Sequence, residues 1–176
     1  GLTGCLTIYN SELINSSLLV TNGKCEDSLN FVNSSGRKIK IRIDDAYADA
    51  VDADFSFLGI ERLHILNAGN DCFDVSGGKY SVGISKLKDC GDKGVSVGEK
   101  SNFEGDKISI ENASIGISVK DFSRAVVKQL NLNSVLVCGE SKTKKQEFGG
   151  GQLFIYETNC DGNYSIDNES MVRIGE

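Results

Sequence analysis

The chain has 176 residues, with 20 glycines, no proline and no tryptophan. At the usual frequency of ~5%, this length would carry about nine prolines, so collagen-like and proline-rich linker structures are excluded and the turns must use Gly, Asn and Asp. The net charge of −6 argues against nucleic acid as the main partner. No apolar run approaches the ~18 residues of a membrane span, and the first residues lack a signal-peptide pattern. We therefore expect one domain that is not inserted in a membrane and, if it is secreted, a signal peptide outside this chain.

A six-residue block recurs every 22 residues. In chain order the blocks are 27–32, 49–54, 71–76, 93–98 and 115–120. The third and fifth residues of each block are apolar, as in Leu29 and Phe31, and the second residue is always small. This alternation predicts a short β-strand whose third and fifth side chains point into a core, with the fourth and sixth pointing outward.

A second alternating segment follows each block after about 14–17 residues. These segments are 39–43, 63–65, 84–87, 108–110 and 130–132. Polar clusters such as 67–70 and 89–92 come next and indicate turns. The Ala-rich stretch 44–54 could be taken for a short helix, but its register with the other blocks favours a strand. The one sizeable insertion is the basic, Gly-rich stretch 142–151.

The repeat pattern resembles the right-handed parallel β-helix of the pectate-lyase-like superfold, over roughly residues 5–160. The resemblance is architectural, and it implies an all-β solenoid of about seven coils of 22 residues. We expect a capping coil at 1–24, the parallel β-helix at 25–160, and a strand or tail at 161–176. Leucine-rich repeats are the alternative, because Ile60, Leu63 and Ile65 match part of their consensus. They are disfavoured because the second strand-like segment recurs equally well and helix-length segments are missing.

The six cysteines suggest an oxidising compartment and hence an extracellular or cell-surface location. Stacked coils bring residues one period apart to about 4.8 Å, which lies within reach of a disulfide. The best candidate pair is Cys138 with Cys160, which are 22 residues apart. Cys5 with Cys25 and Cys72 with Cys90 come next, by their closeness along the coil. The alternative is that the cysteines are free, buried thiols. Zinc is disfavoured, because no Cys-x-x-Cys spacing occurs and the only histidine, His64, is isolated.

Carboxylates gather on the outward positions of the first strands. Asp52, Asp54 and Asp74 are candidate metal ligands, and their oxygen-only chemistry would favour Ca²⁺. Side by side on neighbouring coils, each like-charge pair costs about 3 kcal/mol at an effective dielectric near 20, which a cation would relieve. The alternative is a solvated acidic face.

A second set of outward side chains is a candidate ligand-binding group. Asp49 and Asp71 occupy the first position of successive blocks, and Lys93 ends this column. Glu99 follows in the Gly-rich stretch 91–101 and joins them as a candidate. The alternative is that Lys93 forms an ion pair at the end of the column and that the glycines only make turns.

Catalytic signals are weak. Lys93 and Lys120 are the only candidates for a base, by analogy with lyases that place a lysine beside Ca²⁺-binding aspartates. The resemblance also permits exclusions: the Gly-His-Gly of polygalacturonase-type enzymes and the Trp-x-Asp-His of classical pectate lyases are both missing, since His64 lies between Leu63 and Ile65 and there is no Trp. We expect His64 to be an exposed strand residue without a catalytic role.

The expected function is therefore an extracellular β-helix module, not catalytic by itself, with a structural, self-assembling or surface-binding role. Its partners would be a polysaccharide, another copy or filament neighbour meeting the open ends of the helix, or a larger parent protein. The alternative is a Ca²⁺-dependent lyase or epimerase that acts on an acidic polysaccharide.

Overall fold

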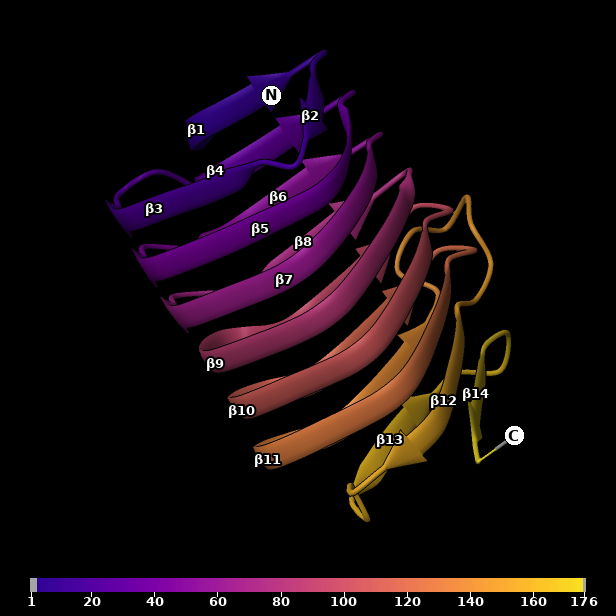
Figure 1. Ribbon diagram of the computed structural model, residues 1–176. Helices are drawn as coiled ribbons and strands as arrows, with labels where there is room; N and C mark the ends of the chain where they lie inside the picture. The colour runs from indigo at the N-terminus through magenta and orange to yellow at the C-terminus, as the bar shows by residue number, and fades with distance from the viewer. Residues whose placement is uncertain (1–2, 176) are drawn as a thin grey trace.

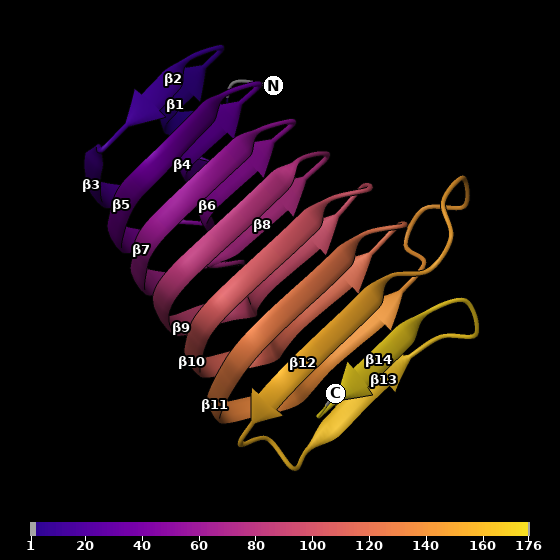
Figure 2. The same cartoon turned by 45° about the vertical axis from the view of Figure 1, so that its right-hand side comes forward.

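The structure is a computed structural model that describes residues 3–175. Within this range the chain is a parallel β-solenoid of about eight turns of ~22 residues, with 75% of residues in strands and no helix (Figures 1 and 2). The expected all-β solenoid is confirmed. The count is about eight turns instead of the expected seven, because the segments at both ends also form strands that stack on their neighbours. No helix among the described residues is long and apolar enough to cross a membrane.

Within residues 3–175, fourteen strands make up the stack. They are β1 (Gly4–Tyr9), β2 (Glu12–Ile14), β3 (Ser17–Gly23), β4 (Asp27–Val32), β5 (Ser35–Ala46), β6 (Asp49–Asp54), β7 (Phe57–Ala68), β8 (Phe73–Ser76), β9 (Lys79–Gly98), β10 (Asn102–Lys120), β11 (Arg124–Lys142), β12 (Gln152–Thr158), β13 (Asn163–Ile166) and β14 (Met171–Ile174). Successive coils pair in parallel, for example β4 with β6 and β5 with β7. The blocks expected at 27–32 and 49–54 coincide with β4 and β6, so the helical interpretation of 44–54 is wrong.

Three columns of paired strands enclose the core, and they begin with β1, β2 and β3. In Figure 1 the strands β3, β5 and β7 lie in front of β4, β6 and β8. We call the outer side of β1, β4, β6, β8 and residues 93–98, 115–120 and 137–142 the first face. We call the outer side of β3 and residues 40–44, 62–66, 84–88, 107–111 and 129–133 the second face. The first and second faces lie on opposite sides of one apolar core.

The core follows from the alternation seen in the sequence. The third and fifth side chains of the first strands are fully buried, as Leu29, Phe31, Val51 and Phe73 show at 0% exposure. The second alternating segment buries Ile41 and its neighbours in the same core. One strand segment was not expected: β5 and β7 begin well before residues 39 and 63, so these coils hold longer strands. The pairing of β5 with β7 has a register shift near its start.

Asn and Asp make the corner between the second strand segment and the next coil. Asp45, Asn67, Asp89 and Asn112 all have positive φ, a conformation that these side chains tolerate better than most. Their side chains also join successive coils, since Asn67 Nδ2 donates to Asp45 Oδ1 at 2.8 Å. The corners therefore need neither proline nor, at these positions, glycine.

The other corner is built on buried serines. Ser34, Ser56, Ser101 and Ser123 are all 2% exposed or less. The Ser34 N–H donates to Ser56 Oγ at 3.0 Å, and the Ser101 N–H donates to Ser123 Oγ at 3.1 Å. These hydroxyls satisfy backbone N–H groups that the turn leaves without a strand partner. The serine ladder was not recognised in the sequence, although its positions recur every 22–23 residues, with Gly78 between Ser56 and Ser101.

All three expected disulfides are confirmed. They are Cys5–Cys25, Cys72–Cys90 and Cys138–Cys160, with Cα–Cα distances of 5.3, 5.4 and 6.2 Å. No free cysteine is left among residues 3–175. Each bridge joins positions that the coil brings close together, as the stacking geometry predicted.

Candidate functional site

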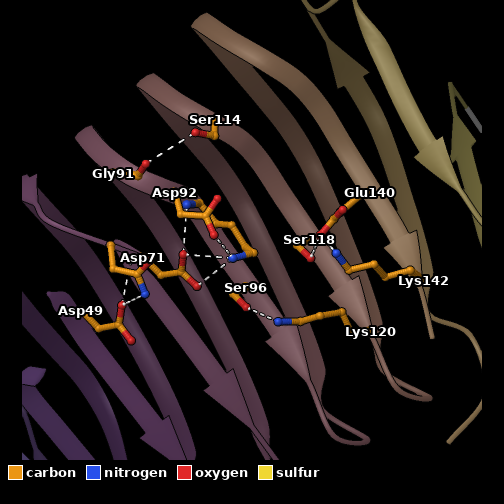
Figure 3. A network of polar contacts seen from close by, with 12 residues as sticks. Asp49, Asp71, Gly91, Asp92, Ser96, Ser114, Ser118, Lys120, Glu140 and Lys142 are labelled. Carbon is orange, nitrogen blue, oxygen red and sulfur yellow. Dashed lines mark hydrogen bonds and ion pairs between the residues drawn. The ribbon is translucent and has the colours of Figure 1, made fainter. Parts of the chain in front are cut away.

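The first face carries a network of polar and charged side chains at the outward positions of its strands. Asn30, Ser96 and Ser118 are 0% exposed there, and Lys120 and Glu140 are 6% exposed. The face is therefore far less solvated than an open acidic sheet, because its longer side chains lie along the stack and cover the shorter ones. Figure 3 shows this for Lys120, which extends toward Ser96; its Nζ donates to Ser96 Oγ at 2.8 Å.

The column of Asp49, Asp71 and Lys93 is a chain of hydrogen bonds that joins three coils. Asp49 Oδ1 accepts from the Asp71 N–H at 2.8 Å, and Asp71 Oδ1 accepts from the Lys93 N–H at 3.0 Å (Figure 3). Lys93 Nζ also lies 3.3 Å from Asp71 Oδ1 and forms an ion pair with Asp92. The predicted stacking of these three residues is confirmed. Their contacts are structural, and a ligand-binding role for them stays a prediction.

Burial and the neighbouring Lys93 charge shift the pKa of the Asp71 carboxyl group in opposite directions. Desolvation raises the pKa of its carboxyl group to about 6, although the nearby Lys93 ammonium lowers it. At Lys93 burial lowers the pKa, but the hydrogen bond to Asp92 and the charge of Asp71 outweigh it and raise the pKa. The pair is therefore charged near neutral pH and loses its carboxylate charge on mild acidification.

The carboxylates proposed as metal ligands lie beside one another, as the register requires. Asp52 is paired with Asp74 across β6 and β8, and Asp54 follows two residues later on the same side of β6. Desolvation, followed by the charges of Asp54, Asp27 and Asp74, raises the pKa of Asp52 to about 8. Desolvation also raises the pKa values of Asp54 and Asp74, and Lys120 opposes the rise at Asp74.

Hydrogen bonds offset only part of this repulsion. Asn30 Nδ2 donates to Asp52 Oδ2 at 2.8 Å, from the coil on the N-terminal side. Among the described residues no group of three or more acidic, His or Cys side chains is arranged to hold a metal ion. Binding of Ca²⁺ by Asp52, Asp54 and Asp74 stays a prediction, and the neighbouring carboxylates are the feature that would attract a cation.

Further along the stack the face becomes a compensated ion-pair network. Ser118 Oγ donates to Glu140 Oε1 at 2.6 Å, and Lys142 Nζ lies 2.9 Å from the same oxygen (Figure 3). Burial would raise the pKa of Glu140, but these two partners lower it overall. Lys120 has a lowered pKa, chiefly because burial disfavours its ammonium form.

Glu99 does not join Asp49 and Asp71. It lies beyond the end of the first-face strand that Lys93 begins, which places the two residues at opposite ends of a six-residue strand. Its carboxylate instead forms an ion pair with Lys145 of the insertion 142–151. The same insertion donates the Lys144 N–H to Asp121 Oδ1 at 2.7 Å, so Glu99 and Asp121 hold the loop against the corner of the stack.

Two features were not found from the sequence. One is the serine ladder. The other is a set of cations on the second face, where Lys40 is in register with Arg62, and Arg42 with His64 and then Lys86. The 22-residue spacing of these basic residues was available as a signal. His64, expected to be an exposed strand residue, is half-buried, and its Nδ1 lies 3.2 Å from Arg42 Nη1.

The fold and the polar first face define the class of the protein: a disulfide-bonded parallel β-solenoid with a half-buried polar network on one face. Comparisons with family models, with curated proteins and with solved structures yield no match.

Proposed function

We propose that this chain is a structural β-helix module of the extracellular or cell-surface space, not catalytic by itself, which associates with a second copy through its N-terminal end. The carrying observation is the first coil, whose core-facing side chains are left partly open. Leu6 is 39% exposed, whereas its register partner on the next coil, Leu29, is 0% exposed. The three disulfides support an oxidising compartment.

Unpaired backbone adds to the open apolar surface at this end. β1, β2 and β3 each pair with one neighbour only, so one edge of each strand has no ladder partner among the described residues. Exposed edges of this kind pair readily with another strand. Inward Ile8, Leu13 and Leu18 are only partly buried beside those edges.

The C-terminal end supplies a matching surface. β13 and β14 end the two strand columns that β1 and β2 begin, and within residues 3–175 neither pairs with a strand on its other edge. The third column is closed differently, because Asn159 Oδ1 accepts from the Leu132 N–H at 2.8 Å and its Nδ2 donates to Leu132 O at 3.1 Å. A second copy stacked head to tail would therefore pair β13 and β14 with β1 and β2 and continue the same parallel coil.

The experiment is sedimentation velocity over a range of concentrations, with Leu6→Lys as the test and Leu19→Lys as the matched control. Leu19 is 65% exposed in the same coil but points out of the second face, away from the open end. We expect the wild type to self-associate, Leu6→Lys to raise the dissociation constant about tenfold or more, and Leu19→Lys to change it little. A strictly monomeric wild type at high concentration, or equal effects of both variants, would overturn the proposal. Far-UV circular dichroism checks that both variants are folded.

The alternative function, a Ca²⁺-dependent lyase or epimerase on an acidic polysaccharide, stays a prediction. Of its two candidate bases, Lys93 is engaged by Asp71 and Asp92. Lys120, with its lowered pKa and its contact with Ser96, is the better suited to accept a proton.

A further inference from the structure

The second face brings basic residues into register across successive coils. Its outward columns are Lys40, Arg62, Ile84 and Lys107; Arg42, His64, Lys86 and Ser109; and Asp44, Leu66, Lys88 and Glu111. Neighbours in a column are separated by the strand spacing of about 4.8 Å. The columns therefore place charge at short, regular intervals along the axis of the stack.

Positive charge dominates three of these coils. Across residues 40–44, 62–66 and 84–88 the face carries five Lys or Arg side chains and one carboxylate, that of Asp44. Asp44 is engaged by Arg42, whose Nε lies 2.9 Å from its Oδ2. Within the described part of the chain, Lys40, Arg62 and Lys86 form no ion pair, so their charges are available to a ligand.

The basic residues border two neighbouring shallow hollows on the second face. One hollow is bordered by Lys40, Arg42, Arg62 and His64 and begins at the first coil. The adjoining hollow starts at the same His64, passes Lys86 and Lys88, and continues to Asn131 and Asn159. Both hollows include His64, so they lie next to each other along the stack, and we call them together the groove. The groove is cationic toward the N-terminal end. Beyond Lys86 it carries amides and hydroxyls and the Glu111 carboxylate, which is paired with Lys88.

The groove suits a linear polyanion, and its lining favours a polysaccharide over a nucleic acid. Apart from the His64 ring, no aromatic side chain lines the described hollows, whereas binding of single strands depends on aromatic stacking of bases. Ser109, Asn131 and Asn133 continue the columns with short donors and acceptors that match sugar hydroxyls. The acidic first face, on the other side of the core, would repel a second stretch of polyanion.

We propose that the second face is a binding site for an acidic polysaccharide that lies along the stack axis, with Lys40, Arg62 and Lys86 engaging its carboxylate or sulfate groups. This site is distinct from the first face, and at β3 it adjoins the open end of the solenoid. Carboxylated and sulfated chains present the same anionic chemistry to these cations. The experiment therefore uses both kinds of probe.

Isothermal titration calorimetry with polygalacturonate and with heparin tests the site, and neutral dextran serves as the uncharged probe. The test variant is Arg62→Gln/Lys86→Gln. The matched control is Lys79→Gln/Lys128→Gln, which removes two exposed lysine charges outside the groove. We expect binding of at least one polyanion, weakened by added salt and reduced about tenfold in the test variant, with a change within about twofold in the control and no binding of dextran.

Four outcomes would overturn the proposal. The first is that neither polyanion binds at low ionic strength. The second is that both double variants weaken binding equally, which indicates a general charge effect. The third is tighter binding of a single-stranded oligodeoxythymidine than of either polysaccharide, which would assign the face to nucleic acid. The fourth is that the protein binds no polysaccharide but self-associates in a salt-sensitive way, and that Arg62→Gln/Lys86→Gln abolishes this self-association. The occupant of the second face would then be the acidic first face of a second copy.

Discussion

At the scale of the residue, Asp52 shows how strongly stacking changes the chemistry of a side chain. Its carboxyl group lies beside Asp54, Asp27 and Asp74 on a half-buried face, and its pKa is raised to about 8. Between about pH 4 and pH 8 the Asp52 carboxyl group therefore carries a proton in the folded state. The unfolded chain, with an ordinary pKa near 4, has already released this proton over the same range. Stability conferred by the protonated form is present below pH 4 and is lost as the pH rises toward 8.

We predict that Asp52→Asn stabilises the protein at pH 8 by about 2–4 kcal/mol, because the amide keeps an acceptor for Asn30 and carries no charge. The gain should vanish below about pH 4, where the wild-type carboxyl group is already neutral. Urea unfolding at several pH values measures it. Asp161→Asn, at an exposed position, is the control and should leave the pH dependence unaltered. A destabilised Asp52→Asn protein at pH 8 would contradict the assigned burial and repulsion.

A second residue-scale prediction separates two buried serines. Ser56 Oγ accepts from the Ser34 N–H at 3.0 Å and donates to Asp54 O at 2.8 Å, whereas the Oγ of Ser85, at 1% exposure, has no hydrogen-bond partner. Ser56→Ala leaves a buried N–H unsatisfied and should cost about 1–3 kcal/mol. Ser85→Ala removes an unpaired buried hydroxyl and should be neutral or stabilising. Equal costs in urea unfolding would show that the ladder hydrogen bonds contribute nothing specific.

At the scale of the element, the serine corner shows how one coil keeps its shape although its residue at this position differs from that of the other coils. Gly78 occupies the ladder position between Ser56 and Ser101, where a Cβ atom would lie only 2.6 Å from the Tyr80 hydroxyl. That hydroxyl accepts from the Ser56 N–H at 3.3 Å and donates to Ala53 O at 2.8 Å. Tyr80 thus takes the place of the missing serine, and burial raises the pKa of its phenol.

Strand segments differ in how well a sequence pattern could locate them. The segments around Leu29 and Ile41 alternate cleanly because one side packs in the core and the other faces outward. The start of β7 was missed, since Gly59 and the register shift of the neighbouring β5 interrupt the alternation there. A strand at a bend is therefore difficult to predict mainly because its alternation of apolar and polar residues is interrupted, and less because its residues are weakly hydrophobic.

At the scale of the whole molecule, coils that are equivalent in register should be separable units. We predict that deletion of one full coil, residues 35–56, leaves a folded solenoid, because Ser34 then joins Phe57, the register partner of Ser35. The three disulfides stay intact in this variant. Its far-UV spectrum should stay β-rich and its unfolding cooperative, with a lower melting temperature. Deletion of half a coil, residues 35–45, removes the strand pairing on one side and should unfold the protein. If both deletion variants fold, or if neither folds, the full coil in register is not the unit that determines folding.

The net charge of −6 hides an uneven distribution that also belongs to this scale. Carboxylates collect on the first face at Asp52, Asp54 and Asp74. Cations collect on the second face, for example at Lys40 and Arg62, which are in register. Both sets recur with the 22-residue period, but their assignment to opposite sides requires the phase of each strand within the coil. The acidic set is recognisable from the sequence because its residues lie within the repeated block, whereas the basic residues lie outside that block.

The sequence by itself determined the 22-residue coil, the inward positions of its strands and the corners without proline, because these depend on local alternation and on the repeat length. It favoured the three disulfide pairs without excluding free thiols. Only the tertiary structure decided that Glu99 holds the insertion instead of joining Asp71, that Ser96 and Ser118 are covered, and that Asp52 keeps its proton. Such properties depend on which side chains cover one another across coils, and hence on desolvation and charge. No single strand carries that information.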